Sequence, residues 1–133
     1  MICRPSVVLL VEDDAVVRTS LRFALETAEL QVEEAGCIAS AERCFRPAST
    51  DIAIIDVHLP DGCGCQLVPR LRCRKRNLAV VLISTDPDDP ELEGPGMAIP
   101  PDCIVLAKPF SSGALLDAIS REVARVESTR GQD

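Results

Sequence analysis

The 133-residue sequence lacks any long apolar run. No segment approaches the roughly 18 consecutive apolar residues that a membrane-spanning helix needs, and residues 1–6 lack the apolar stretch of a signal peptide. The formal net charge of -7 argues against a nucleic-acid-binding surface. We therefore expect a single cytoplasmic domain that binds no membrane and makes no direct contact with nucleic acid.

Histidine is also scarce, whereas cysteine is abundant. His58 is the only histidine, against seven cysteines. An odd number of cysteines without a secretory signal indicates reduced thiols rather than disulfides. Cys63 and Cys65 form a Cys-x-Cys pair, but a zinc site needs two further ligands at similar spacing and none is evident. We expect the cysteines to pack as small core or surface residues, with metal binding as the alternative.

The hydrophobic pattern alternates between strand and helix along the chain. Apolar runs predict strands at 7–11, 30–34, 52–55, 79–84 and 103–107, and apolar spacings of three and four predict helices at 17–28, 38–45, 65–75 and 112–126. Ser111 is a plausible N-cap of the last helix. Strands that are apolar on both faces and alternate with helices indicate an α/β fold, a doubly wound five-stranded parallel sheet covered by helices on both faces.

The helix at 65–75 leads into a basic segment. Its cations, largely on the outer face, are Arg70, Arg72, Arg74, Lys75 and Arg76. We interpret this run as a solvated face, with a binding patch as the alternative.

Polar residues stand where the predicted strands end. They are Glu12, Asp13 and Asp14 after the first strand, Asp56 after the third, Ser84 and Thr85 after the fourth, and Lys108 after the fifth. The carboxyl ends of parallel strands meet at one edge of a sheet, so these side chains are expected to converge. Clustered carboxylates favour Mg²⁺, and a carboxylate beside that ion can attack a phosphoryl group. The pattern predicts a phosphoryl-acceptor site in which the lysine and the hydroxyl hold phosphoryl oxygens.

Three motifs in this order resemble the receiver domain of two-component response regulators. They are "LLVEDD" at 9–14, "DVHLPDGCG" at 56–64 and "LAKPF" at 106–110. The resemblance covers essentially the whole chain and implies a flavodoxin-like sheet with strand order 2-1-3-4-5. It implies that Asp56 accepts a phosphoryl group from a histidine kinase or a histidine phosphotransfer protein, with Ser84 as switch hydroxyl and Lys108 as phosphoryl-binding residue.

The same resemblance implies a magnesium site. Asp13, Asp56 and the backbone carbonyl of His58 would bind Mg²⁺ directly, and Glu12 would act mainly through water. Because the first motif contains three acids, its register needs a second marker. Arg18 lies five residues after Asp13, as the family's arginine lies after its second acid, and this favours Glu12 and Asp13 as the pair. The peptide before Pro109 is expected to be cis.

Two departures from the family concern the output side. Val105 occupies the position of the family's switching aromatic residue, so an aromatic flip is excluded. The proline-rich segment 84–102 stands where the family has its fourth helix, and we expect at most one or two turns near 88–93, followed by a loop. That loop is either a tolerated substitution or a surface remodelled for a partner. His58 and Asp86 occupy positions that influence phosphoryl lifetime in the family.

The resulting interpretation is a receiver domain over 1–127 with a polar tail at 128–133. It is a signalling switch rather than an enzyme, it acts on a downstream protein, and a homodimer is compatible with it. Because only this tail follows the last predicted helix, we expect no DNA-binding or enzymatic output domain within the given sequence. Both a stand-alone receiver and a piece of a longer regulator fit this pattern. A haloacid-dehalogenase-type phosphohydrolase is the alternative, but it would have aspartate where His58 stands. A degenerate receiver used only for docking or dimerisation is the third reading.

Overall fold

The computed structural model describes residues 6–85 and 103–130, with side chains to residue 128. The strands of the main sheet are β1 (Val7–Val11), β2 (Gln31–Ala35), β3 (Thr50–Asp56), β6 (Ala79–Ser84) and β7 (Ile104–Ala107). The helices are α1 (Ala15–Thr27), α2 (Ile38–Cys44), α3 (Gly64–Arg74) and α4 (Ser112–Arg130). Two short strands, β4 (His58–Leu59) and β5 (Gly62–Cys63), form a separate antiparallel pair.

The main sheet has the strand order β2-β1-β3-β6-β7, and every neighbouring pair is parallel. Because β6 and β7 are its fourth and fifth strands, the predicted order 2-1-3-4-5 is confirmed. The inner strands β1, β3 and β6 are almost completely buried, as expected for strands covered on both faces.

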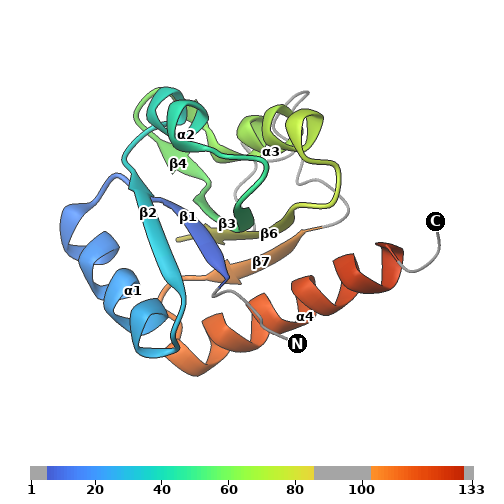
Figure 1. Ribbon diagram of the computed structural model, residues 1–133. Coiled ribbons are helices and arrows are strands. Elements are labelled where there is room, and N and C mark those ends of the chain that lie inside the picture. Colours follow the sequence, from blue (N-terminus) through green and yellow to red (C-terminus); the bar gives the residue numbers. More distant parts are fainter. Residues whose placement is uncertain (1–5, 86–102, 131–133) are drawn as a thin grey trace.

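Helices cover both faces of this sheet, and each face has its own apolar core (Figure 1). Successive residues of a strand point to opposite faces, so Leu9 and Val11 pack with α2 and α3, whereas Val8 and Leu10 pack with α1 and α4. This two-sided burial explains why the apolar runs in the sequence were continuous rather than alternating.

Several boundaries differ from the predicted ones. β3 begins at Thr50 rather than residue 52, and α4 continues to Arg130, so residues 128–130 are helical although we expected them in the tail. Ser111 does cap α4, because its Oγ accepts a hydrogen bond from the Ala114 N–H at 3.0 Å. The predicted short turns at 88–93 lie outside the described residues. None of the helices in the described ranges is long and apolar enough to cross a membrane.

The cysteines of the described ranges are all free thiols. Cys63 and Cys65 are buried in the core between the sheet and α3. Burial, together with the neighbouring Cys63, raises the pKa of Cys65 to about 12, which keeps this thiol protonated and unreactive.

Gly64 sets the distance between α3 and the end of β3. Its N–H donates to the Val57 carbonyl at 2.7 Å. A Cβ at this position would overlap the backbone carbonyl of Asp56 and would lie 2.8 Å from Ile55 Cγ2. Only glycine lets the first turn of α3 approach the strand this closely.

We predict that Gly64→Ala lowers the free energy of unfolding by about 3 kcal/mol, because the added methyl group must displace backbone rather than a flexible side chain. Gly113→Ala is the matched control, since the nearest atom to its Cβ would be Ser111 Oγ at 3.8 Å. That change should be neutral or stabilising by up to about 1 kcal/mol. Urea unfolding followed by circular dichroism measures both, and equal stabilities would contradict the packing argument.

Candidate functional site

The site forms where β1 and β3 end side by side. Val11 pairs with Ile55 in the sheet, so the next residues, Glu12 and Asp56, lie next to one another. Both are buried, with 1% and 5% of their surfaces exposed. Two buried carboxylates at neighbouring strand ends need a cationic partner, because an unpaired buried charge is costly.

Lys108 supplies that partner from the end of β7. Its Nζ lies 2.9 Å from Glu12 Oε2 and 2.9 Å from Asp56 Oδ2. The Lys108 backbone N–H donates to the Ser84 carbonyl at 2.8 Å, which fixes the residue against β6. The ammonium therefore joins the ends of β1, β3 and β7. The peptide between Lys108 and Pro109 is cis, as predicted.

Asp56 is held by two different donors. Lys108 contacts Oδ2, and the backbone N–H of His58 donates to Oδ1 at 2.9 Å. The His58 side chain itself is exposed. The carboxylate is therefore fixed in place before any ligand binds, which reduces the reorganisation that a reaction at this group requires.

The three acids after β1 have separate surroundings. The Asp14 carboxylate caps α1 by accepting from the Val16 N–H at 2.9 Å, and the Glu12 carboxylate accepts the Asp14 N–H at 3.2 Å. Arg18 Nη1 donates to the Glu12 carbonyl at 2.7 Å. Asp14 therefore caps α1, whereas Glu12 and Asp13 lie with Asp56 at the edge of the sheet.

One oxygen from each of Glu12, Asp13 and Asp56 lies within 4.8 Å of the others. This is the single group of three or more metal-ligating side chains among the residues that the structure describes. Carboxylate oxygens are the ligands that Mg²⁺ prefers, usually with water and phosphate oxygens completing its shell. The arrangement is therefore consistent with a magnesium site.

The pKa shifts of Glu12 and Lys108 also favour a cation site. Burial raises the pKa of Glu12 to about 7, and the nearby Asp56 adds to this rise although Lys108 opposes it. Burial alone would lower the pKa of Lys108, but its hydrogen bonds to Glu12 and Asp56 outweigh this and raise it. One ammonium is thus too little positive charge for the clustered carboxylates, and a divalent cation would complete the balance.

Of the remaining predicted residues, Ser84 lies at this edge. Ser84 is buried at the end of β6, directly after Ile83, which pairs with Asp56. Val105, which stands at the position of the family's switching aromatic residue, is half-buried and packs against the core on the α2 and α3 face. Asp86 lies outside the described residues.

Sequence reasoning missed the role of Asp61, which fixes the loop after β3 to α2. Its carboxylate accepts hydrogen bonds from the N–H groups of Ile38 at 2.8 Å and Ala39 at 3.0 Å. These bonds lower the pKa of Asp61. The partner residues lie more than twenty positions away in the sequence, so local patterns could not reveal the contact.

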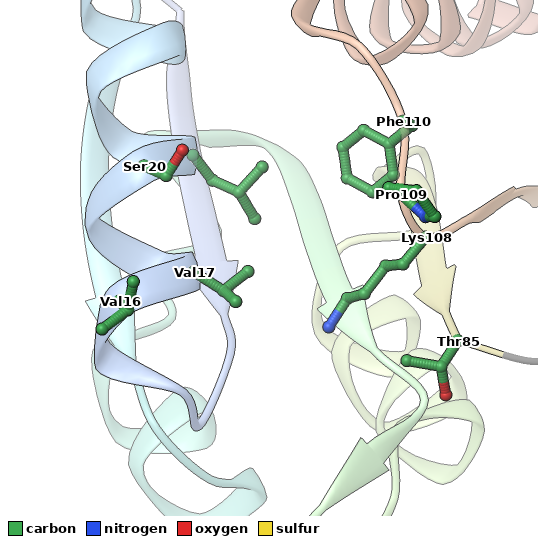
Figure 2. Close-up of a pocket in the computed structure, with 8 residues that line it drawn as sticks. Val16, Val17, Ser20, Thr85, Lys108, Pro109 and Phe110 are labelled. Carbon is green, nitrogen blue, oxygen red and sulfur yellow. The ribbon is translucent and has the colours of Figure 1, made fainter.

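An apolar groove beside the site was also missed. It has a volume of about 520 Å³, and its lining residues are Val16, Val17, Ser20, Leu21, Thr85, Lys108, Pro109 and Phe110. Figure 2 shows Lys108 and Phe110 facing the helix that carries Val16 and Val17. Val16 at the groove is 79% exposed, and the groove combines elements distant in the sequence, so no local pattern revealed it.

The comparisons with known proteins agree with this geometry. Residues 8–120 match the response regulator receiver domain family, and the chain belongs to this family. Receiver domains are generally signalling domains of two-component systems rather than enzymes.

Among curated proteins, the transcriptional regulatory protein FixJ from Azorhizobium caulinodans is 29% identical over 127 residues, covering 92% of this chain and 58% of FixJ. The DNA-binding transcriptional regulator NtrC from Bradyrhizobium is 34% identical over 77 residues, covering 58% of this chain and 16% of NtrC. The chain therefore spans well under two thirds of the length of these relatives.

Solved structures show the same fold. A CheY-like response regulator receiver domain protein from Methanospirillum hungatei JF-1 has a TM-score of 0.82 and 20% identity, covering 95% of this chain and 99% of that chain. The response regulator TrrA from Thermotoga maritima, solved in complex with Mg(2+)-BeF, has a TM-score of 0.75 and 17% identity, covering 88% of this chain and 98% of its own.

We predict that Asp13→Asn weakens Mg²⁺ binding by about tenfold or more, because one of three convergent carboxylates is lost. Asp14→Asn removes the same charge from the adjacent residue but retains an N-cap side chain, so it should bind Mg²⁺ as wild type does. Isothermal titration calorimetry suits this chain, which has no tryptophan or tyrosine for intrinsic fluorescence. Equal weakening by both substitutions would contradict the register of the site.

Proposed function

We propose that the chain accepts a phosphoryl group on Asp56 from a histidine kinase or a histidine phosphotransfer protein, in the presence of Mg²⁺, and thereby changes a protein-interaction surface. One observation carries the proposal. The Asp56 carboxylate is held between the Lys108 ammonium and the His58 N–H, beside Glu12 and Asp13. A nucleophilic carboxylate, a cation for the phosphoryl oxygens and acidic metal ligands are the parts that aspartyl phosphorylation requires.

The transfer conserves atoms and charge in a simple way. One Asp56 oxygen bonds to phosphorus, the bond from phosphorus to the donor's imidazole nitrogen breaks, and its electron pair returns to the imidazole. Lys108 already lies 2.9 Å from the Asp56 carboxylate and can follow the phosphoryl oxygens as charge accumulates on them. The Ser84 hydroxyl, at the adjoining strand end, is the second donor that we assign to those oxygens. Asp13, Asp56 and the His58 carbonyl would hold Mg²⁺, with Glu12 in support, and the ion would supply neutralising charge.

The alternative classes fit the site less well. A phosphohydrolase of the haloacid-dehalogenase type needs an acidic residue two positions after the nucleophile, where His58 stands exposed. A receiver fold kept only for docking has no need for buried Glu12 and Asp56 around Lys108, since such a cluster costs desolvation energy.

We predict that incubation with acetyl phosphate and Mg²⁺ adds one phosphoryl group to wild-type protein and none to Asp56→Asn, as measured by intact-mass spectrometry. Asp61→Asn is the matched control, because it changes an exposed carboxylate five residues away and leaves Asp56 intact. An adduct that persists in Asp56→Asn, or that forms equally with EDTA present, would refute the assignment.

We further propose that the donor protein docks at the groove between α1 and the β7–α4 connection. The groove includes Lys108, so it is continuous with the acceptor site, and its lining is mostly apolar. A protein that brings a phosphohistidine to Asp56 must approach this edge of the sheet, whereas a small phosphodonor needs no such surface. The exposed Val16 at the groove is a suitable apolar contact for such a partner.

We predict that Val16→Glu lowers the rate of phosphotransfer from a histidine-phosphorylated phosphotransfer domain by about tenfold, because a charge is buried at the contact. The rate with acetyl phosphate should stay unchanged. Phe23→Glu is the matched control, because Phe23 is also exposed on α1, at 73%, but does not line the groove. Equal loss in both variants, or loss with acetyl phosphate as well, would contradict docking at the groove.

A further inference from the structure

The cations of this acidic protein are concentrated in one region. Segments 42–51 and 70–77 contain seven of its 14 lysines and arginines but only two of its 21 acidic residues. The exposed members are Arg43, Arg46, Arg70, Arg74 and Arg76, which we call the basic patch. Because these two segments have a positive net charge, the rest of the chain carries a net negative charge larger than the -7 of the whole chain.

The fold joins the two segments into one surface. Helices α2 and α3 lie side by side over the same face of the sheet (Figure 1). Arg74 Nη1 donates to the Glu42 carbonyl at 2.9 Å, Nη2 donates to the Phe45 carbonyl at 3.2 Å, and the guanidinium lies 5.0 Å from the centre of the Phe45 ring. Arg70 lies 3.7 Å from the Glu42 carboxylate. The end of α3 is thus fixed to the end of α2.

A second set of contacts brings in the other arginines. Lys75 Nζ donates to the Thr50 carbonyl, and the Thr50 N–H donates to the Arg46 carbonyl at 2.8 Å. Arg46 and Lys75 both contact Thr50, the first residue of β3, and Arg76 follows Lys75 in the chain. The patch lies where β3 begins.

A solvated face explains only part of this patch. Arg43 and Arg74 lie in the last turns of α2 and α3, where cations offset the helix dipole. Arg46 and Arg76 lie beyond the helix ends, and within the described ranges neither forms an ion pair. By contrast, exposed Arg121 pairs with Asp117 on its own helix. Two exposed arginines that no carboxylate of the described residues balances favour an anionic partner.

We propose that the basic patch is a second interaction surface, which docks an acidic segment of a partner protein. Charge distribution selects this occupant over an extended polyanion. A nucleic acid or an anionic membrane would extend past the patch toward the rest of the chain, which carries the excess of acidic residues and would repel it. A short acidic helix or loop can match the patch alone, and arginine pairs with carboxylates through two parallel hydrogen bonds.

The patch is well separated from the acceptor site. Asp56 lies at the other end of β3, which has 7 residues, so the two ends are about 20 Å apart at roughly 3.3 Å per residue. An acidic segment at the patch leaves the carboxyl edge of the sheet open, and the chain can hold this partner and a phosphodonor together.

The proposal is tested with a fluorescein-labelled ten-residue oligoglutamate peptide and fluorescence anisotropy at low salt. Arg46→Gln with Arg76→Gln should weaken binding by about tenfold, the loss expected for two charge contacts at a surface. The matched control, Arg22→Gln with Arg121→Gln, has the same net charge but changes ion-paired residues outside the patch, and it should bind within about twofold of wild type.

Equal weakening in both double variants would show that net charge, not the patch, governs binding and would overturn the proposal. Tighter binding of a 20-nucleotide single-stranded RNA or of phosphatidylserine vesicles than of oligoglutamate would overturn the choice of partner. The titration uses unphosphorylated protein, so its outcome does not depend on whether Asp56 accepts a phosphoryl group.

Discussion

The contact of the Lys108 ammonium with the carboxylates of Glu12 and Asp56 is the interaction on which the site depends. It joins side chains that lie 96 and 52 positions apart in the sequence, at the ends of three strands. Without it, two buried carboxylates would face each other uncompensated. One ammonium balances them only in part, since the pKa of Glu12 remains raised to about 7. Uncompensated carboxylate charge costs stability, and the same imbalance favours a divalent cation, so stability and the proposed function are opposed at this edge.

The backbone around β3 keeps Asp56 in place against this electrostatic cost. Gly64 lets α3 begin directly against the strand, and the His58 N–H fixes one carboxylate oxygen. Asp61 extends the support to α2 by accepting hydrogen bonds from its first N–H groups. The motif "DVHLPDGCG" is therefore a structural unit as well as a chemical one. The proposed acceptor Asp56, its backbone donor, the residue that anchors α2 and the close-packed glycine all lie within nine residues.

The sequence was sufficient to predict the sheet and the convergence of its polar ends. Continuous apolar runs reflect burial on both faces, and parallel strands bring their carboxyl ends to one edge, so Glu12, Asp56 and Lys108 could be placed together in advance. The two-residue strands β4 and β5 have no period to detect. The Asp61 contact and the groove at Val16 depend on elements distant in sequence. The basic run after residue 69 was interpreted as a solvated face because the other part of the patch, Arg43 in α2 and Arg46 just after it, is distant in the sequence.

The two ends of β3 differ in charge, with the acidic cluster at the Asp56 end and the basic patch near the Thr50 end. Phosphorylation would add about -1.5 to -2 charges at an edge that is already acidic. Salt screens interactions between exposed charges over about 8 Å at physiological ionic strength, which is less than half of the roughly 20 Å along β3. Direct electrostatic influence of the phosphoryl group on the basic patch is therefore small. Any coupling between the two surfaces has to pass through rearrangement of packed elements, and β3, buried at every residue except the half-buried Asp51, offers little freedom for that. The proposed acceptor site and the proposed docking patch are therefore expected to act independently.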